Sequence, residues 1–422
     1  MDSDRDHKIR TLWLSGVLHA FTHIYHVALL PLYLLIQADF KLASVGQATL
    51  LVTVMMAGYF IPSYPMGILA DRISRKKLLG CGLAINGLGF VGLSLSPNYP
   101  CALASMVLAG FGGSFYHPAA TAMVARLFPT GTGKALGLVG VGASIGFFFG
   151  PLYTGWRAAT AGWRAPVLEL GLLGIIAAGL FAWFAEEQPA RKAAEKIKAP
   201  EEKMFPTPAL WLFFIAMSFA FSLRDFAGTG MGSLGSLFLQ NARGFTLKET
   251  GLALSSLFIA SVISNPLFGH LSDRGRIRWT GLVLVIAAIV MAIFPHVPRN
   301  WIIPALLVYG FFFLAGYPMI EAALMESVPD AVRGRVFGFF ITVGGLLGNL
   351  SHWLVGKWVK GLGAQAVEPT AYFPIYGLLA LFVVLSLAGL PCLHAIRKRE
   401  EQIHPDAGAA TASVSRTRHE PA

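Results

Sequence analysis

Twelve apolar runs divide this sequence, and a run of about 20 residues is enough to cross a lipid bilayer as a helix. The first six runs lie at 11–36, 45–69, 78–96, 100–127, 134–156 and 164–185, and the second six at 207–239, 249–271, 279–297, 301–326, 335–358 and 371–395. Only 13% of the residues are charged and 55% are hydrophobic, about half the charged fraction of an ordinary soluble domain. These features exclude a water-soluble fold and a disordered chain. They predict an all-α membrane protein whose twelve transmembrane helices form two six-helix bundles.

Polar segments flank and separate the two sets of runs. A charge-rich linker at 186–206 divides the first predicted bundle, 11–185, from the second, 207–395. Residues 1–10 form a short charged N-terminus, and the apolar run after them is too long for a signal-peptide core, so we expect it to be retained. The tail at 396–422 ends in a stretch rich in Pro, Ala, Ser and Thr, and we expect the tail to be disordered.

Lysine and arginine are distributed unequally between the two sides of the predicted membrane protein. The termini, the linker and the loops on their side hold 24 of the 33 basic residues, the opposite loops hold eight, and Arg224 lies within a run. Basic loops remain cytoplasmic, so we expect a multi-pass protein of the cell's inner (plasma) membrane with both termini cytoplasmic. The net charge of +11 then reflects topology and attraction to lipid headgroups, and we expect no nucleic-acid partner.

Cysteine spacing adds neither a disulfide framework nor a metal site. Cys81, Cys101 and Cys392 are far apart and form no Cys-x-x-Cys or Cys/His pattern. We therefore expect no metal and no cofactor.

A short motif occurs twice, after the second and the eighth runs. Its residues are Gly67, Asp71, Arg72 and Arg75 in the first copy, and Gly269, Asp273 and Arg274 in the second, 202 positions later. Glycine allows two helices to approach closely. The alternative interpretation is that any short cytoplasmic loop is basic, but the same order at equivalent places favours duplication of a six-helix unit, as in transporters.

This motif resembles the signature loop of the major facilitator superfamily, and the resemblance covers residues 11 to 395. Ser74 stands where that family usually has glycine. The resemblance implies two six-helix bundles that rock about a central site. It also implies that Asp71 and Arg72 contribute to contacts between the bundles in one access state.

The fifth run has a second pattern, Gly137, Gly146, Gly150 and Pro151. It resembles the antiporter motif of exporters in the superfamily and so implies export. The alternative is that small residues simply pack membrane helices against one another.

Residues in three runs resemble a narrower group, the fosmidomycin-resistance subgroup of drug exporters. They are Gly110 to Pro118 in the fourth run, His19 in the first, and Glu326 to Pro329 at the end of the tenth. This resemblance implies efflux and drug resistance. His23 stands near the position where that subgroup has an aspartate.

Ionisable residues within membrane-spanning runs are costly and often functional. His19, His23 and His26 are spaced i, i+4 and i+7, so they share one face of the first helix, and His117 lies beside Pro118 in the fourth run. We predict that these histidines bind substrate or protons. The alternative is that they only hydrogen-bond helices together.

Three further ionisable residues lie in the second half. Arg224 and Asp225 occupy the middle of the seventh run, near the repeat position of the first-run histidines, and Glu321 lies in the tenth. Adjacent helix residues point about 100° apart, so Arg224 or Asp225 is expected to serve another partner, unless the two pair structurally. Glu321 is a second candidate proton carrier. The excess of positive groups favours an anionic or zwitterionic substrate.

These features together predict a proton-coupled antiporter that exports small anionic or amphiphilic compounds such as antibiotics. The first alternative is an importer of organic anions or nutrients, and a more distant one is a membrane enzyme or receptor. No Gly-x-x-x-x-Gly-Lys-Ser/Thr sequence is present, so ATP is not the expected driver. We expect a monomer whose partners are the bilayer, a small-molecule substrate and protons.

Overall fold

The computed structural model describes residues 2–70, 72–129, 131–186, 203–273, 275–329 and 332–403. All regular structure in this part of the chain is helical. In lipid a helix satisfies its own backbone hydrogen bonds, so the apolar runs fold as helices.

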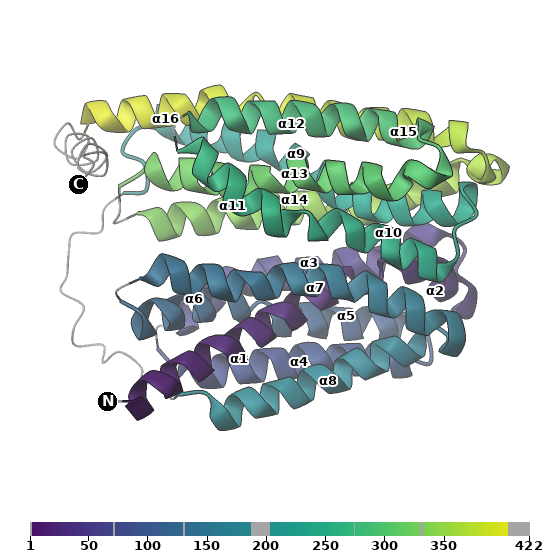
Figure 1. The fold of residues 1–422 in the computed structure, drawn as a ribbon, viewed down its shortest axis with the longest axis horizontal. Helices are drawn as coiled ribbons and strands as arrows, with labels where there is room; N and C mark the ends of the chain where they lie inside the picture. Colours follow the sequence, from purple (N-terminus) through teal and green to yellow (C-terminus); the bar gives the residue numbers. More distant parts are fainter. Residues whose placement is uncertain are drawn as a thin grey trace.

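The described residues of the first half form eight α-helices and one short 3₁₀ turn. They are α1 (Asp2–Val27), η1 (Leu30–Leu32), α2 (Tyr33–Asp39), α3 (Val45–Ala70), α4 (Arg75–Leu95), α5 (Tyr99–Gly113), α6 (Tyr116–Leu127), α7 (Thr132–Ala161) and α8 (Arg164–Phe184). Figure 1 shows this half as the purple and blue layer of the molecule.

The second half forms the teal-to-yellow layer (Figure 1). Its helices are α9 (Pro208–Ala242), α10 (Leu247–Ile259), α11 (Ser261–Ser272), α12 (Arg276–Ile293), α13 (Ile302–Glu326), α14 (Arg333–Gly361), α15 (Phe373–Ser386) and α16 (Gly389–Ile403). Short 3₁₀ turns connect them: η3 (Phe294–His296), η4 (Arg299–Trp301), η5 (Gly363–Val367) and η6 (Pro369–Tyr372).

Each predicted run corresponds to one helix or to one pair of consecutive helices. Among the described residues, 11 segments are long and apolar enough to span a membrane. The remaining predicted run, 100–127, is divided into α5 and α6, neither of which is long enough alone. The all-α membrane fold is therefore confirmed.

Proline accounts for two of the helix interruptions. Pro31 lacks the amide hydrogen that would bond to the carbonyl of Val27, where α1 ends. Pro118 likewise leaves the carbonyl of Ser114 without its helical donor, and α5 gives way to α6 at Ser114 and Phe115. The second interruption places His117 in the first turn of α6.

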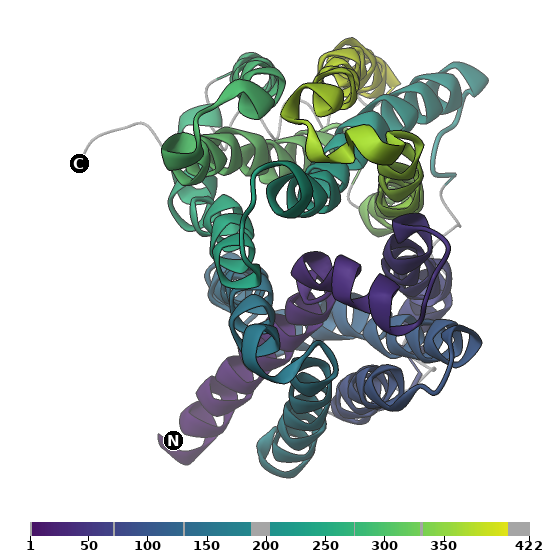
Figure 2. The ribbon, with the colours of Figure 1, turned by 90° about the vertical axis from the view of Figure 1, so that its right-hand side faces the viewer.

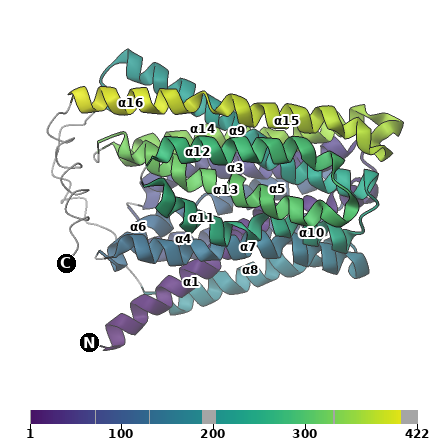
Figure 3. The ribbon, with the colours of Figure 1, turned by 45° about the horizontal axis from the view of Figure 1, so that its top comes forward.

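The C-terminal part of the described chain differs from the expectation. We predicted a disordered tail from residue 396, but α16 continues to Ile403, so this prediction was wrong for 396–403. Ile396 is fully buried, and the guanidinium of Arg399 lies 5.1 Å from the ring centroid of Phe213. These contacts hold the end of α16 against the second half, along which the helix runs (Figure 3). The rest of the predicted tail, 404–422, and linker residues 187–202 lie outside the described residues.

The two halves meet at the end of the molecule away from the start of α1. There α3 packs on α14 and α7 packs on α10. Glycines permit this approach, because a Cβ added at Gly46 would meet the backbone at Gly356, and one added at Gly155 would meet that of Gly251. Figure 2 looks onto this end, where the purple segment containing η1 and α2 lies between the halves.

The opposite end, at which α1 begins and α16 finishes, is less tightly packed. A Cβ added at Gly133 or Gly137 of α7, or at Gly334 or Gly338 of α14, would meet no atom within 4 Å. The two layers diverge toward this end (Figure 1). The structure thus has one closed end and one end at which the halves stand apart.

Candidate functional site

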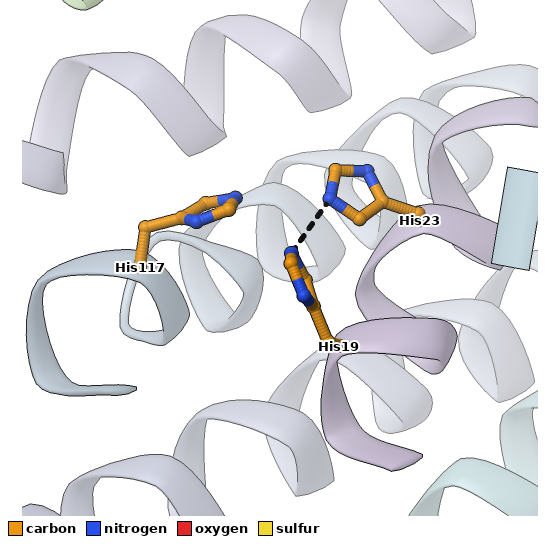
Figure 4. A group of neighbouring side chains, drawn as sticks. All are labelled: His19, His23 and His117. Atoms are coloured by element: carbon orange, nitrogen blue, oxygen red, sulfur yellow. Dashed lines mark hydrogen bonds between the residues drawn. The ribbon is translucent and has the colours of Figure 1, made fainter. Parts of the chain in front are cut away.

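Four histidines of the first half gather between α1 and α6. His19, His23 and His26 lie on one face of α1, as their spacing predicted, and His117 projects from α6 toward His19 and His23 (Figure 4). The ring centroids of His19 and His117 are 5.2 Å apart, and those of His23 and His26 are 5.0 Å apart. We call these four residues the histidine cluster.

A chain of hydrogen bonds fixes the proton positions on two of these rings. Nδ1 of His19 lies 2.9 Å from the carbonyl oxygen of Val139, so Nδ1 carries the hydrogen and Nε2 is left as an acceptor. Nε2 of His23 lies 3.1 Å from Nε2 of His19 and therefore donates to it. Nδ1 of His23 is buried and has no hydrogen-bond partner among the described residues.

Close packing of α7 on α1 makes the bond to Val139 possible. A Cβ added at Gly142 or Gly146 would overlap a carbonyl oxygen of α1, and one added at Gly150 would lie 3.1 Å from another. Two members of the predicted antiporter motif, Gly146 and Gly150, thus pack against the helix that carries the histidines. Gly137 faces open space, and a Cβ on Gly251 would meet the carbonyl oxygen of Pro151.

Aromatic side chains surround the histidine cluster. The ring of Tyr116 stacks on His19 at 4.8 Å, that of Phe147 lies 4.3 Å from His23, and that of Tyr59 lies 4.9 Å from His26. Tyr116 also donates from its hydroxyl to the carbonyl oxygen of Ser15 at 2.8 Å. His117 is exposed, although Tyr116 and Ala119 of the same helix are buried, so this side of the cluster is accessible.

A second polar cluster lies in the other half. Arg224 is almost fully buried, with a side chain 2% exposed, and it donates from Nε at 3.0 Å and from Nη2 at 2.6 Å to one carboxylate oxygen of Asp225. The two adjacent residues therefore pair with each other. This is the structural pairing that the sequence left open as the alternative to separate partners. Nη1 of Arg224 is buried and has no hydrogen-bond partner among the described residues.

Two residues of α13 complete this group. The ring of Tyr317 lies beneath the guanidinium of Arg224, at 4.1 Å from its centroid, a cation–π contact. Glu321 follows one turn later on the same helix face and interacts electrostatically with Arg224. We call Arg224, Asp225, Tyr317 and Glu321 the charged cluster.

Glycines of α14 leave room for Asp225. A Cβ added at Gly344 would lie 2.7 Å from its carboxylate, and one added at Gly348 would lie 2.8 Å from its Cβ.

One polar group that joins the two halves was not predicted from the sequence. His352 of α14 bonds through Nδ1 to Ser233 at 2.6 Å and through Nε2 to Asn349 at 3.2 Å. The hydroxyl of Ser233 in turn lies 3.0 Å from that of Tyr33, in the first half, and Thr53 of the first half donates to the carbonyl oxygen of Asn349. An ionisable residue inside the run 335–358 was the signal that could have found His352.

The signature loops lie at the end where the halves diverge, and the first copy packs against α6, the helix that carries His117. Arg75 donates to the carbonyl oxygen of Ala122 in α6 at 3.1 Å. Arg72 is exposed, and Gly67 is close enough to Pro118 that an added Cβ would touch it at 3.6 Å.

The second copy of the loop has a similar anchor. Exposed Asp273 accepts from Arg276 at 3.3 Å, and Arg276 also donates to Glu326 of α13. Gly269 faces open space. Asp71 and Arg274, which were also predicted to act in these loops, lie outside the described residues.

Comparison with known proteins agrees with this geometry. The family model of the Major Facilitator Superfamily matches residues 12–351. The chain is similar to the fosmidomycin resistance protein of Escherichia coli (strain K12), with 24% identity over 387 residues that cover 86% of this chain and 90% of that protein. It is also similar to the cis,cis-muconate transport protein of Acinetobacter baylyi, with 23% identity over 364 residues, 82% of this chain and 87% of that one.

Among solved structures, the fold matches a bacterial homolog of the human lysosomal transporter Spinster in an inward-facing, unoccupied conformation. The TM-score is 0.75 at 16% sequence identity, over 93% of this chain and 97% of that chain. The family match covers most of the sequence, and its members are secondary transporters rather than enzymes. This chain therefore belongs to the Major Facilitator Superfamily.

Proposed function

We propose that this protein is a proton-coupled exporter that exchanges protons for small anionic or amphiphilic compounds such as antibiotics. The observation that carries the proposal is Nη1 of Arg224, a buried charged donor without a hydrogen-bond partner among the described residues. Leaving such a donor unpaired is costly, and a carboxylate or phosphonate oxygen is the partner that a guanidinium binds best.

The proton carriers that we propose are the histidine cluster, Asp225 and Glu321. Imidazole exchanges protons near neutral pH, and the hydrogen-bond chain from Val139 through His19 to His23 offers a path along α1. A proton taken up or released there changes the relative stability of the two access states, and so shifts the equilibrium between them.

We propose that the termini are cytoplasmic, following the bias of basic residues. The end at which the halves diverge is then the cytoplasmic end, and this conformation faces inward. Substrate would reach the exposed side of His117 from the cytoplasm. The contacts of Tyr33, Ser233 and His352 would hold the outer end closed.

Export is favoured by two features. The glycines of the predicted antiporter motif, Gly146 and Gly150, pack against the histidine-bearing helix. One relative is named a fosmidomycin resistance protein. The second candidate is import of organic anions with protons, which is favoured by the relative named a cis,cis-muconate transport protein.

A proteoliposome assay with a trapped pH-sensitive dye tests this proposal. A phosphonate, a carboxylate and a lipophilic cation are added in turn to vesicles with and without an imposed pH gradient. We expect the anions, and not the cation, to drive proton movement in the opposite direction. Movement of protons together with the anion would support import, and a response to the cation alone would contradict the anion proposal.

Arg224 variants show whether the charged cluster binds the substrate. Arg224→Gln should abolish the anion response, because Gln retains hydrogen-bond donors but not the charge. Arg157→Gln is the matched control, since Arg157 is also paired, with Glu169 at 2.8 Å, but its side chain is 33% exposed. If both variants lose activity equally, Arg224 has no specific role in substrate binding.

A further inference from the structure

Three members of the histidine cluster come together in a way that proton transfer alone does not require. The nitrogen atoms that His19, His23 and His117 can each offer to a metal ion all lie within 4.8 Å of one another. Figure 4 shows the three rings directed toward a common point, two from α1 and one from α6. This convergence could not be seen in the sequence, in which His117 lies more than 90 positions after His19 and His23.

The chemistry of the three side chains suits a divalent ion of the first transition row. Neutral imidazole is a preferred ligand of Zn²⁺, Cu²⁺ and Ni²⁺, and three histidines that leave a fourth position open form a known type of zinc site. Histidines at i and i+4 of a helix, such as His19 and His23, present both rings on one face. His117 supplies the third ring from the neighbouring helix.

The bond between His19 and Val139 resembles the outer contacts of metal-binding histidines. Such a histidine donates its other ring hydrogen to a carboxylate or a backbone carbonyl, which fixes both its tautomer and its orientation. Nδ1 of His19 already donates to the carbonyl oxygen of Val139. Nε2 of His19 is thereby left unprotonated and directed toward His23.

The spacing of the two α1 histidines is close to that of two ligands on one ion. With metal–nitrogen bonds of about 2.0–2.1 Å, two nitrogens of a tetrahedral site lie roughly 3.3–3.4 Å apart. The Nε2 atoms of His19 and His23 are 3.1 Å apart. To become a ligand, Nε2 of His23 has to transfer its hydrogen to Nδ1, and Nδ1 has no hydrogen-bond partner to lose. No proton is gained or released in that change.

We infer that His19, His23 and His117 form a binding site for a divalent transition-metal ion such as Zn²⁺. Because His117 is exposed, a fourth ligand can approach the three nitrogens from its side. All three ligands belong to the first half, so a bound ion does not link the halves and does not prevent their relative movement. The inference differs from the sequence prediction of no metal site, and it does not depend on the direction of transport.

Metal titration of the purified protein tests the inference directly. The protein is purified through an affinity tag that contains no histidine, treated with a chelator, and titrated with Zn²⁺ by calorimetry and with Co²⁺ by visible absorption. We expect one ion per chain, with the strong visible bands of Co²⁺ in a tetrahedral site. Absence of saturable binding at one ion per chain in the wild-type protein would overturn the inference.

Single variants assign the ligands. His19→Gln, His23→Gln and His117→Gln should each weaken binding by at least about tenfold, the loss caused by removing even an outer contact of a metal ligand. His352→Gln, a buried histidine of the other half, and His296→Gln, an exposed one, should bind as the wild type does. Unchanged binding in the first three variants, or equal loss in the two controls, would also overturn the inference. Since the wild-type titration measures no transport, a negative result there leaves the proposed antiport untouched.

Discussion

The two halves share a helical plan but hold different chemistry at equivalent places. In the first half Tyr116, which precedes the proline of the fourth span, stacks on His19 at 4.8 Å. In the second half Tyr317, which precedes the proline of the tenth, lies 4.1 Å from the guanidinium of Arg224. In each half, therefore, a tyrosine one or two positions before a proline contacts a polar residue of the half's first helix.

The supported groups differ in how they respond to their surroundings. An imidazole group has a neutral and a protonated form, whereas the guanidinium of Arg224 stays protonated and is neutralised by its pair with Asp225. We infer that both halves kept the tyrosine after duplication, while the side chains that it contacts diverged. The first half would then exchange protons or bind a metal ion, and the second would hold an anion.

Of the two clusters, the charged cluster should lose more stability when a single residue is replaced. Arg224→Gln leaves Asp225, whose side chain is 15% exposed, without its cation, and breaking a buried pair costs about 3–5 kcal/mol. Thermal unfolding in detergent should show a large loss of stability. The double variant Arg224→Gln/Asp225→Asn should regain most of the stability but not the anion response. If the double variant is as unstable as the single one, the pair is not the source of the effect.

The positions of the spans and the shared face of His19, His23 and His26 could be predicted because both depend on local sequence. Hydropathy determines which segments cross a bilayer, and helical periodicity determines which residues share a face. The approach of His117 to His19 could not be predicted, since it depends on how α6 packs beside α1. For the same reason, the sequence did not show that the bond of His19 to Val139 needs the glycines of α7.

Arg224 and Asp225 illustrate a different limit. The angle between adjacent side chains on a helix suggested separate partners, but the long arginine side chain bends back to the carboxylate. A helical projection gives the direction in which a side chain leaves the helix, but not where a long, flexible side chain ends. The helical segment at 396–403 was missed because composition alone did not reveal that Ile396 is buried against the second half.

The packing of α7 on α1 gives a second prediction, which concerns the first half alone. Gly146→Ala places a methyl group against the carbonyl oxygen of Ala20, so we expect a loss of about 1–3 kcal/mol from overpacking. The helices should also move apart enough to weaken the bond between His19 and Val139. Gly137→Ala is the control, because its methyl group meets no atom within 4 Å. Equal unfolding temperatures for the two variants would contradict this account of the motif.

The tyrosine of the charged cluster should act through its ring. Tyr317→Phe keeps the ring beneath Arg224 and should change stability little. Tyr317→Leu removes the cation–π contact, which is worth about 0.5–2 kcal/mol. The comparison is made by chemical or thermal unfolding of both variants beside Tyr116→Phe. A larger effect of Tyr317→Phe than of Tyr317→Leu would mean that the hydroxyl group, not the ring, supports Arg224.

The bond network at the closed end belongs to neither half alone, so weakening it should change how the halves sit relative to each other. Ser233→Ala removes the hydroxyl between Tyr33 and His352, and one hydrogen bond of about 1 kcal/mol corresponds to roughly a fivefold change in population. We expect the population of the state that is closed at the end near the termini to increase by that factor.

Spin labels at Gly133→Cys and Gly334→Cys, exposed residues of the diverging end, measure this change after the native cysteines are replaced by serine. Distances between the labels should shorten in the Ser233→Ala variant. Ser222→Ala is the matched control on the same helix, because the hydroxyl of Ser222 bonds only to the carbonyl oxygen of Ser218 among the described residues. If both variants give the wild-type distances, the network contributes nothing to the balance between states. A shift in Ser233→Ala alone would show that the two halves, despite their different chemistry, are coupled through the closed end.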